Sequence, residues 1–168
     1  MQILQGSLES HCTEYRCQDN MEVARGRMGG KAVNAGSMDG FPLRYVALEE
    51  PEETNTLVLG LSDIQDGSGN TLIIERGLSY DEQDAALGQD TYSISTASGA
   101  TVYSGIIRCV SNDQVLTLDF TAEAADGLGI THTCQFPLEL DLGSIERLRK
   151  GLRRVFEDES SASLELSI

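Results

Sequence analysis

The segment ITHTCQFPLELDLGSIERLRKGLRRVF, residues 130–156, contains the two clearest patterns of the chain and decides its fold class. From Ile130 to Leu142, every second position carries Ile, His, Cys, Phe or Leu, while the positions between them carry Thr, Gln, Pro, Glu or Asp. A period of two predicts a β-strand with one face in the core. Pro137 falls on the polar side of this pattern, so we expect an edge strand or a bulge there.

Within the same pattern, His132 shares the apolar face with Ile130 and Cys134. We therefore predict a hydrogen-bonded core histidine rather than a catalytic one. The only other histidine of the chain is His11, so a Ser-His-Asp or Cys-His site has few ways to form.

The second pattern is a helical period that predicts an amphipathic helix over residues 145–157. We expect Ser144 to be its N-cap, and Gly151 to lower its stability by about 1 kcal/mol relative to alanine. Because the chain has a net charge of −15, we expect the basic residues of this helix to pair with the protein's own acidic residues rather than with nucleic acid. The apolar stripe consists of Ile145, Leu148, Leu152, Val155 and Phe156.

Upstream of this segment, short apolar stretches separated by turns predict further β-strands. The turn-forming sequence DGSGN at residues 66–70 predicts a hairpin between two of them, and ASGA at residues 97–100 predicts another. The predicted strands cover residues 42–48, 56–62, 71–75, 91–96, 101–110 and 115–121.

Two short helices are expected between these strands. Ser79 and Glu82 have the spacing of a capping box and predict a helix at 80–87. Thr121 has the side chain of an N-cap and predicts a helical turn near 122–127. Together these elements predict an α+β fold that is mostly β, with an antiparallel sheet of about seven strands covered by the C-terminal helix.

The length of 168 residues fits one domain of ordinary size. Residues 1–40 are rich in glycine and have no usable hydrophobic period, so we expect a flexible extension. We place a single domain at 41–157 and an acidic tail at 158–168. The alternation of apolar residues from Leu164 onward makes an edge strand the alternative for this tail, although disorder is favoured.

The charge of the chain excludes several classes of function. There are 27 acidic and 12 basic side chains, and residues 41–143 carry 17 acidic but only three basic ones. A nucleic-acid binder needs a basic surface to neutralise phosphates, and an anionic membrane surface also attracts basic segments. We therefore expect no nucleic-acid partner and no membrane partner. The absence of a long apolar run or a signal-peptide pattern predicts a cytoplasmic protein.

No motif of catalysis or of cofactor binding is present, and we predict no catalytic residue, no cofactor and no metal site. The chain has no phosphate-binding glycine motif and no nucleophile elbow. His11, Cys12 and Cys17 form a loose cluster that lacks the spacing of a zinc site. The four cysteines are too few and too scattered for a disulfide framework, so we expect free thiols. An enzyme with a carboxylate-based site stays an alternative, because paired acids can converge without a sequence motif.

The run VLTLDFTAEAADGLGITHTCQFPLELDLGSIERLRKGLRRVF, residues 115–156, resembles immunity protein family ten of bacterial polymorphic toxin systems. The shared features are a strand ending in Phe-Thr, the sequence AEAADGLG, a strand carrying F-x-L-x-L, and a final helix of the form LRxGLRRVF. The upstream stretches LIIERG, DTYSIST and VYSGIIRC also resemble the family, so the similarity covers residues 42–157. The resemblance implies a mostly β protein without enzymatic activity that neutralises a toxin encoded by a neighbouring gene.

The charge pattern then suggests where such a toxin binds. Toxins that cut nucleic acids are commonly basic, because they hold phosphates, and an acidic partner associates with them rapidly. The main hypothesis is therefore a toxin-neutralising immunity protein that acts by stoichiometric binding. The alternative is an acidic accessory or scaffold domain with another protein partner. The predicted partner-binding residues are Glu49, Glu50, Glu52, Glu53, Asp63, Asp66, Asp81, Glu82, Asp84 and Asp90.

Overall fold

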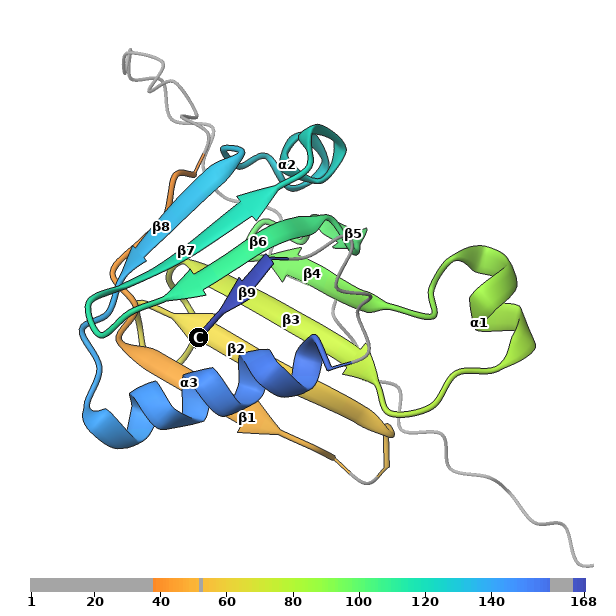
Figure 1. Cartoon of the computed structure of the whole chain (residues 1–168), viewed down its shortest axis with the longest axis horizontal. Helices are drawn as coiled ribbons and strands as arrows, with labels where there is room; N and C mark the ends of the chain where they lie inside the picture. Colours follow the sequence, from red (N-terminus) through yellow and green to blue (C-terminus); the bar gives the residue numbers. More distant parts are fainter. Residues whose placement is uncertain (1–37, 52, 158–164) are drawn as a thin grey trace, which may run out of the picture. The chain divides into compact units, whose positions relative to one another are not determined.

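The computed structural model describes residues 38–51, 53–157 and 165–168, and within them it confirms the α+β, mostly β fold class. Nine strands in this described part form two sheets (Figure 1). The first is an antiparallel meander of β1 (Tyr45–Glu49), β2 (Thr56–Ser62), β3 (Thr71–Gly77), β4 (Tyr92–Thr96) and β5 (Thr101–Tyr103). The second has the order β8 (Thr133–Pro137), β7 (Val115–Phe120), β6 (Ile106–Ser111) and β9 (Glu165–Ser167).

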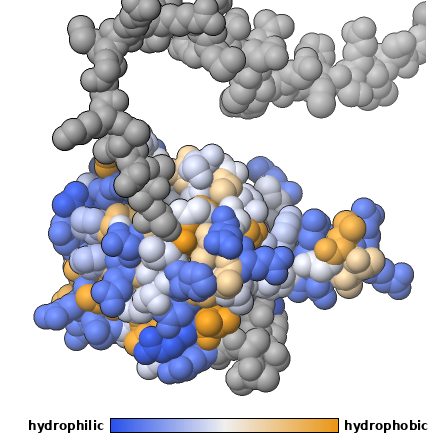
Figure 2. Space-filling view, turned by 90° about the horizontal axis from the view of Figure 1, so that it is seen from above, coloured by the Kyte–Doolittle hydropathy of each residue, from blue (hydrophilic) through white to orange (hydrophobic). Residues whose placement is uncertain are grey.

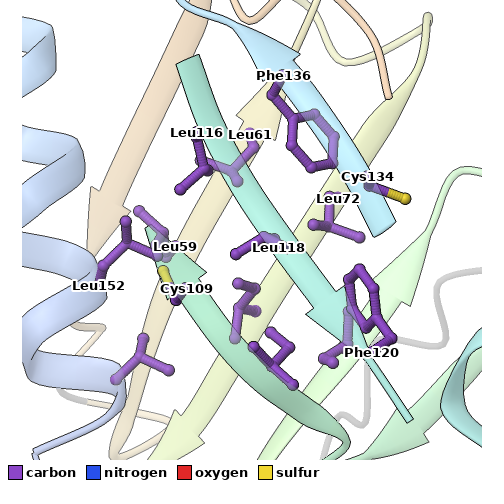
Figure 3. Close-up of a cluster of buried hydrophobic side chains, with 14 of the residues drawn as sticks. Leu59, Leu61, Leu72, Cys109, Leu116, Leu118, Phe120, Cys134, Phe136 and Leu152 are labelled. Carbon is purple, nitrogen blue, oxygen red and sulfur yellow. The ribbon is translucent and has the colours of Figure 1, made fainter. Parts of the chain in front are cut away.

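Three helices accompany the two sheets: α1 (Glu82–Leu87), α2 (Ala122–Leu128) and α3 (Leu142–Val155). The core lies between the inner faces of the sheets and under α3. Figure 3 shows Leu59 and Leu72 of the first sheet together with Leu118 of the second. All three side chains are fully buried, as the alternation of their strands predicts.

Helix α3 lies against the inner face of the first sheet, and Gly151 explains how closely it packs. A Cβ atom at Gly151 would lie 2.7 Å from Cδ1 of Leu59 and 3.2 Å from Cδ1 of Leu48. The glycine therefore allows a close helix–sheet contact. The buried apolar stripe of the helix is confirmed, but the helix begins at Leu142, with Asp141 rather than Ser144 as its N-cap. The carboxylate of Asp141 accepts the N–H of Ser144 at 2.9 Å.

The prediction of one strand over residues 101–110 was wrong, because this run contributes to both sheets. It divides into β5 and β6 at Ser104 and Gly105, whose φ angles are +58° and +101°. A Cβ atom at Gly105 would overlap the side chain of Ala124, so α2 can pack here only against glycine. This break replaces the single predicted sheet with two.

The long alternation after residue 130 was also interpreted too broadly. Only Thr133–Pro137 forms a strand, which lies at a sheet edge as Pro137 predicted. The chain bends at His132, which turns this side chain away from the core, although Ile130 and Cys134, two positions to either side, are buried. His132 is therefore exposed and not a core histidine. Leu142 belongs to α3 and is 82% exposed.

The short helix near 80–87 is confirmed with a different cap. Asp81 is the N-cap of α1, and its carboxylate accepts the N–H groups of Gln83 and Asp84 at 2.8 and 2.9 Å. Gly88 ends the helix in the left-handed conformation, as expected. The helical turn after Thr121 is confirmed as α2.

The C-terminal residues of the described chain form a strand, where disorder was favoured. Residues 165–167 pair with β6 in parallel, and Arg108 forms an ion pair with Glu165. Of the predicted N-terminal extension, residues 1–37 lie outside the described residues, as do residues 158–164 of the predicted tail.

Candidate functional site

The predicted partner-binding residues lie at two opposite ends of the first sheet. In an antiparallel meander, successive connections alternate between the two ends. The β1–β2 turn and the β3–β4 connection therefore share one end, and the β2–β3 turn lies at the other (Figure 1). We call the shared end the acidic end. Glu49, at the end of β1, belongs to it, as do six acids on turns or on α1: Glu50, Glu53, Asp81, Glu82, Asp84 and Asp90. Glu52 falls outside the described residues, and Asp63 and Asp66 lie at the opposite end.

The most prominent part of the acidic end is the β3–β4 connection, residues 78–91, which we call the acidic arm. Its helix α1 has no buried residue, and Leu87 and Leu78 are 61% and 47% exposed. The arm carries four acidic residues and no basic one. Figure 2 shows it extending from the body at the right, with both hydrophilic and hydrophobic atoms on its surface.

Hydrogen bonds hold the base of the acidic arm in place. The N–H of Leu78 donates to the carbonyl of Asn55 at 2.9 Å, and the side-chain amide of Asn55 donates to the hydroxyl of Ser79 at 2.6 Å. At the other side of the base, the hydroxyl of Tyr80 donates to the carbonyl of Thr91 at 2.9 Å. The base of the arm is therefore fixed to the sheet, whereas no residue of its helix α1 is buried.

A cavity of about 500 Å³ separates the base of the arm from the C-terminal end of α3. Arg76 lies in its wall, is buried, and donates from its guanidinium to the carbonyl of Val155 at 2.8 Å. A cation at this position complements the negative end of the helix dipole. Arg154 also lines the cavity and forms an ion pair with Glu50. Glu50 therefore already has a cationic partner within the chain. The acids of the arm form no ion pair with another described residue.

Within the described part of the chain, two of the five basic residues of α3 pair with the protein's own acids, which confirms the prediction for those two. Besides the Arg154–Glu50 pair, Arg149 binds Asp113 at 2.8 Å. Outside the helix, Arg44 binds Glu139 at the same distance, which raises the pKa of the Arg44 guanidinium. Several arginines of the described residues are therefore already paired with acidic residues of the same chain.

The two acids at the opposite end shape the β2–β3 turn. Asp63 accepts the backbone N–H of Asn70 at 2.8 Å and its side-chain amide at 2.7 Å. Asp66 interacts with the hydroxyl and the backbone N–H of Ser68, and these hydrogen bonds lower the pKa of Asp66. Asp66 is therefore firmly ionised at neutral pH while it remains exposed.

Sequence analysis did not identify the outer face of the first sheet as a surface of interest. Beside Asp66, this face contains a second cavity of about 250 Å³ whose lining includes Tyr45, Gly60 and Ile73. Gly60 lies inside β2. The alternation of this strand predicted only that position 60 faces away from the core. The signal that was available is the glycine itself, because a glycine inside a strand often marks a close approach.

Catalysis usually needs a metal ion, a reactive nucleophile or an acid with a shifted pKa. No group of three or more metal-ligating side chains occurs in the part of the chain that the structure describes. Burial raises the pKa of the Cys109 thiol to about 12 and also raises that of Cys134, so both are poor nucleophiles. A carboxylic acid that donates a proton needs a raised pKa, whereas hydrogen bonds from Ser144 lower the pKa of Asp141, as those from Ser68 do for Asp66.

Comparison with known proteins identifies one family. The profile of the family described as Immunity protein 10 matches residues 43–146, which includes both sheets up to β8 and the start of α3. The searches of curated proteins and of solved structures gave no match. Among the described residues, no helix is long and apolar enough to cross a membrane.

Proposed function

Because this chain belongs to the immunity protein 10 family, we propose that it neutralises one cognate toxin by forming a stoichiometric complex with it. The observation that carries the proposal, besides the family, is the acidic arm. It presents four acids and two exposed leucines, and none of the residues of its helix is buried. A helix that stabilises nothing in its own protein is available to a partner.

The charge of the arm indicates the character of that partner. A surface with acids and no base attracts a basic surface and accelerates its approach. A toxin that cuts nucleic acid needs a basic surface to hold phosphates, so an acidic protein bound there blocks the substrate. We therefore propose a basic toxin, such as a nuclease, and binding in the cytoplasm, where such a toxin would meet its substrate.

Co-expression tests this function directly. An immunity gene should lie directly downstream of a large multidomain toxin gene, so the probe is the C-terminal domain encoded by the gene immediately upstream, expressed in a bacterial host with and without the present chain. We expect growth to be rescued and a 1:1 complex to be recovered. Toxicity without rescue, or a harmless neighbour, would contradict the immunity function and favour an acidic accessory domain with a different partner.

Charge reversal tests the acidic end as the binding surface. Among the described residues, Glu49, Glu53 and Glu82 take part in no helix cap and no ion pair, so Glu→Lys at these three positions changes the charge without removing such a contact. We expect the association rate with a catalytically inactive toxin domain to fall about tenfold or more at low salt, and less at high salt.

The matched control reverses three exposed acids elsewhere, Glu123, Asp126 and Glu146, which lie on α2 and α3. Both triple variants change the net charge by the same amount. An equal loss of association rate in the two variants would show that only total charge matters and would remove the acidic end as the specific surface.

A further inference from the structure

The outer face of the first sheet is uncovered by the other described elements. α3 lies on the inner side, where Gly151 faces Leu59, and α2 packs near Val102, which also faces inward. Adjacent strands align the outward residues into rows across the sheet. These outward residues are Tyr45, Ala47, Glu49, Thr56, Val58, Gly60, Ser62, Thr71, Ile73, Glu75, Gly77, Ser93, Ser95, Thr101 and Tyr103.

The composition of this face is unusual for a surface that only meets water. It combines tyrosine, serine, threonine and small residues with apolar side chains, and it includes two glutamates but no basic residue. Tyrosine gives a large, rigid contact area at a low cost in entropy, and small polar residues adapt their hydrogen bonds. The same composition serves protein-binding surfaces elsewhere.

The cavity of about 250 Å³ lies on this face, where Gly60 and Ala47 are opposite each other in register. Neither residue has a side chain large enough to fill the space above it. Tyr45, which is 41% exposed, and Ile73 belong to the apolar part of the lining. The β2–β3 turn completes it with Gln65, Asp66 and Gly67.

This cavity therefore combines an apolar floor with one carboxylate at its rim. Long basic side chains have the matching structure, because their aliphatic stems pack on apolar surface while the cationic head stays near water and anions. An aspartate or glutamate side chain would be repelled by Asp66, and a purely apolar side chain would not neutralise the charge of its carboxylate. Charge complementarity thus selects a cation.

We infer that the cavity beside Gly60 receives a lysine or arginine side chain of the toxin, with its stem over Gly60 and Ile73 and its charge at Asp66. The inference rests on the proposed function and adds a second contact, at the end of the sheet opposite to the acidic arm. It also gives Asp66 a defined role among the acids that were predicted to bind a partner.

Gly60→Val provides the sharpest test, because it fills the cavity without disturbing the fold. An added Cβ would meet only Cβ of Ala47, at an ordinary 3.5 Å, and β-branched residues suit a strand. We expect its denaturation midpoint to equal or exceed that of the wild type, and its affinity for the inactive toxin domain to fall about tenfold or more. Ser93→Val places the same side chain on the same face but outside the cavity lining, and we expect less than about a threefold loss.

Asp66→Asn removes the charge and keeps an oxygen that accepts the N–H of Ser68. We expect about a tenfold loss of affinity, and no further loss when this change is added to Gly60→Val, because both remove the same contact. Additive effects would show that Asp66 acts only through its long-range field and would overturn the inference. Equal losses in Gly60→Val and Ser93→Val would overturn it as well.

The wild-type protein separates this inference from the proposed function. If the wild type does not bind the toxin domain, the function fails and the inference fails with it. If the wild type binds and Gly60→Val binds equally well, the function stands and the cavity has no part in it.

Discussion

Helices α1 and α3 are both capped by an aspartate, Asp81 and Asp141, whose carboxylate accepts backbone N–H groups of the first turn. Apart from this cap, the two helices differ in how many of their residues are buried. α3 buries its apolar stripe against the first sheet. At its C-terminal end, the carbonyl of Val155 accepts a hydrogen bond from the buried guanidinium of Arg76. α1 buries nothing, and its Leu87 is 61% exposed.

The comparison shows that the same local capping chemistry serves two purposes in this chain. α3 contributes to the free energy of folding, because its side chains leave water when the protein folds. α1 is formed by its caps and by the anchored base of the arm, so its side chains remain available for an interface. The two helices should therefore respond very differently to equivalent substitutions.

The largest expected difference concerns one leucine in each helix. Leu148→Ala in α3 removes a fully buried side chain, and we expect the free energy of unfolding to fall by about 3 kcal/mol. Leu87→Ala in α1 should change it by less than about 0.5 kcal/mol. Denaturant unfolding followed by circular dichroism measures both. A loss above about 1 kcal/mol for Leu87→Ala would mean that α1 packs in solution, and the comparison would not hold.

The second prediction concerns the cation at the end of α3. Arg76→Met removes the donor to the Val155 carbonyl, and we expect a loss of about 2 kcal/mol in the free energy of unfolding. Lys150→Met, at an exposed position of α3, is the matched control and should cost less than about 0.5 kcal/mol. Equal effects would show that the position of the charge at the helix end is unimportant.

The smallest effect concerns the caps and depends on pH. The pKa of Asp141 is lower in the folded protein than its ordinary value of about 3.9, so its contribution to stability is present above that value and is lost as the pH falls through the lower, folded pKa. We expect Asp141→Asn to be less stable than the wild type at neutral pH, and this difference to disappear in strong acid. Unfolding midpoints measured across the acid range check this.

Asp81→Asn provides the comparison for this pH series. Because α1 contributes no buried residue, we expect the global unfolding midpoint of this variant to follow the wild type at neutral pH. A shift as large as that of Asp141→Asn would indicate that the arm and the core unfold as one unit.

The elements that depend on residues close together in the sequence were predicted correctly. The hairpins, the short helix before Gly88 and the apolar stripe of α3 all follow local turn chemistry or a clear period. The caps were harder, because Asp81 and Asp84 compete with Ser79 and Glu82 for the same role. The aspartate pair forms the reciprocal hydrogen bonds, although it lacks the usual Glu or Gln.

The division into two sheets could not be predicted from the alternation. Val102 and Ile106 are four residues apart and both face the core, so the period of two continues unchanged across the break at Ser104 and Gly105. The change at His132 was hidden for a related reason. A bend turns His132 outward while Ile130 and Cys134 stay buried, so the sequence pattern is unbroken where the chain leaves the strand.

The candidate site was predictable in its charge and not in its geometry. Glu49, Glu50, Glu53, Asp81 and Glu82 are exposed, as a partner-binding surface requires, but Asp63 and Asp66 were grouped with them. Strand connectivity separates the two groups, because the β2–β3 turn is at the other end of the meander. The cavity beside Gly60 needed the structure, since its lining comes from three strands and a turn.

The isolation of α1 also has a consequence for how the protein can evolve. Natural proteins keep only a small margin of stability, so most substitutions in a core are removed by selection. Substitutions in a helix without buried residues consume almost none of that margin. The arm can therefore change its charge and its apolar residues in step with a changing toxin, while α3 and the sheets keep their sequence. Diversification of partner choice in this fold should begin at residues 82–87.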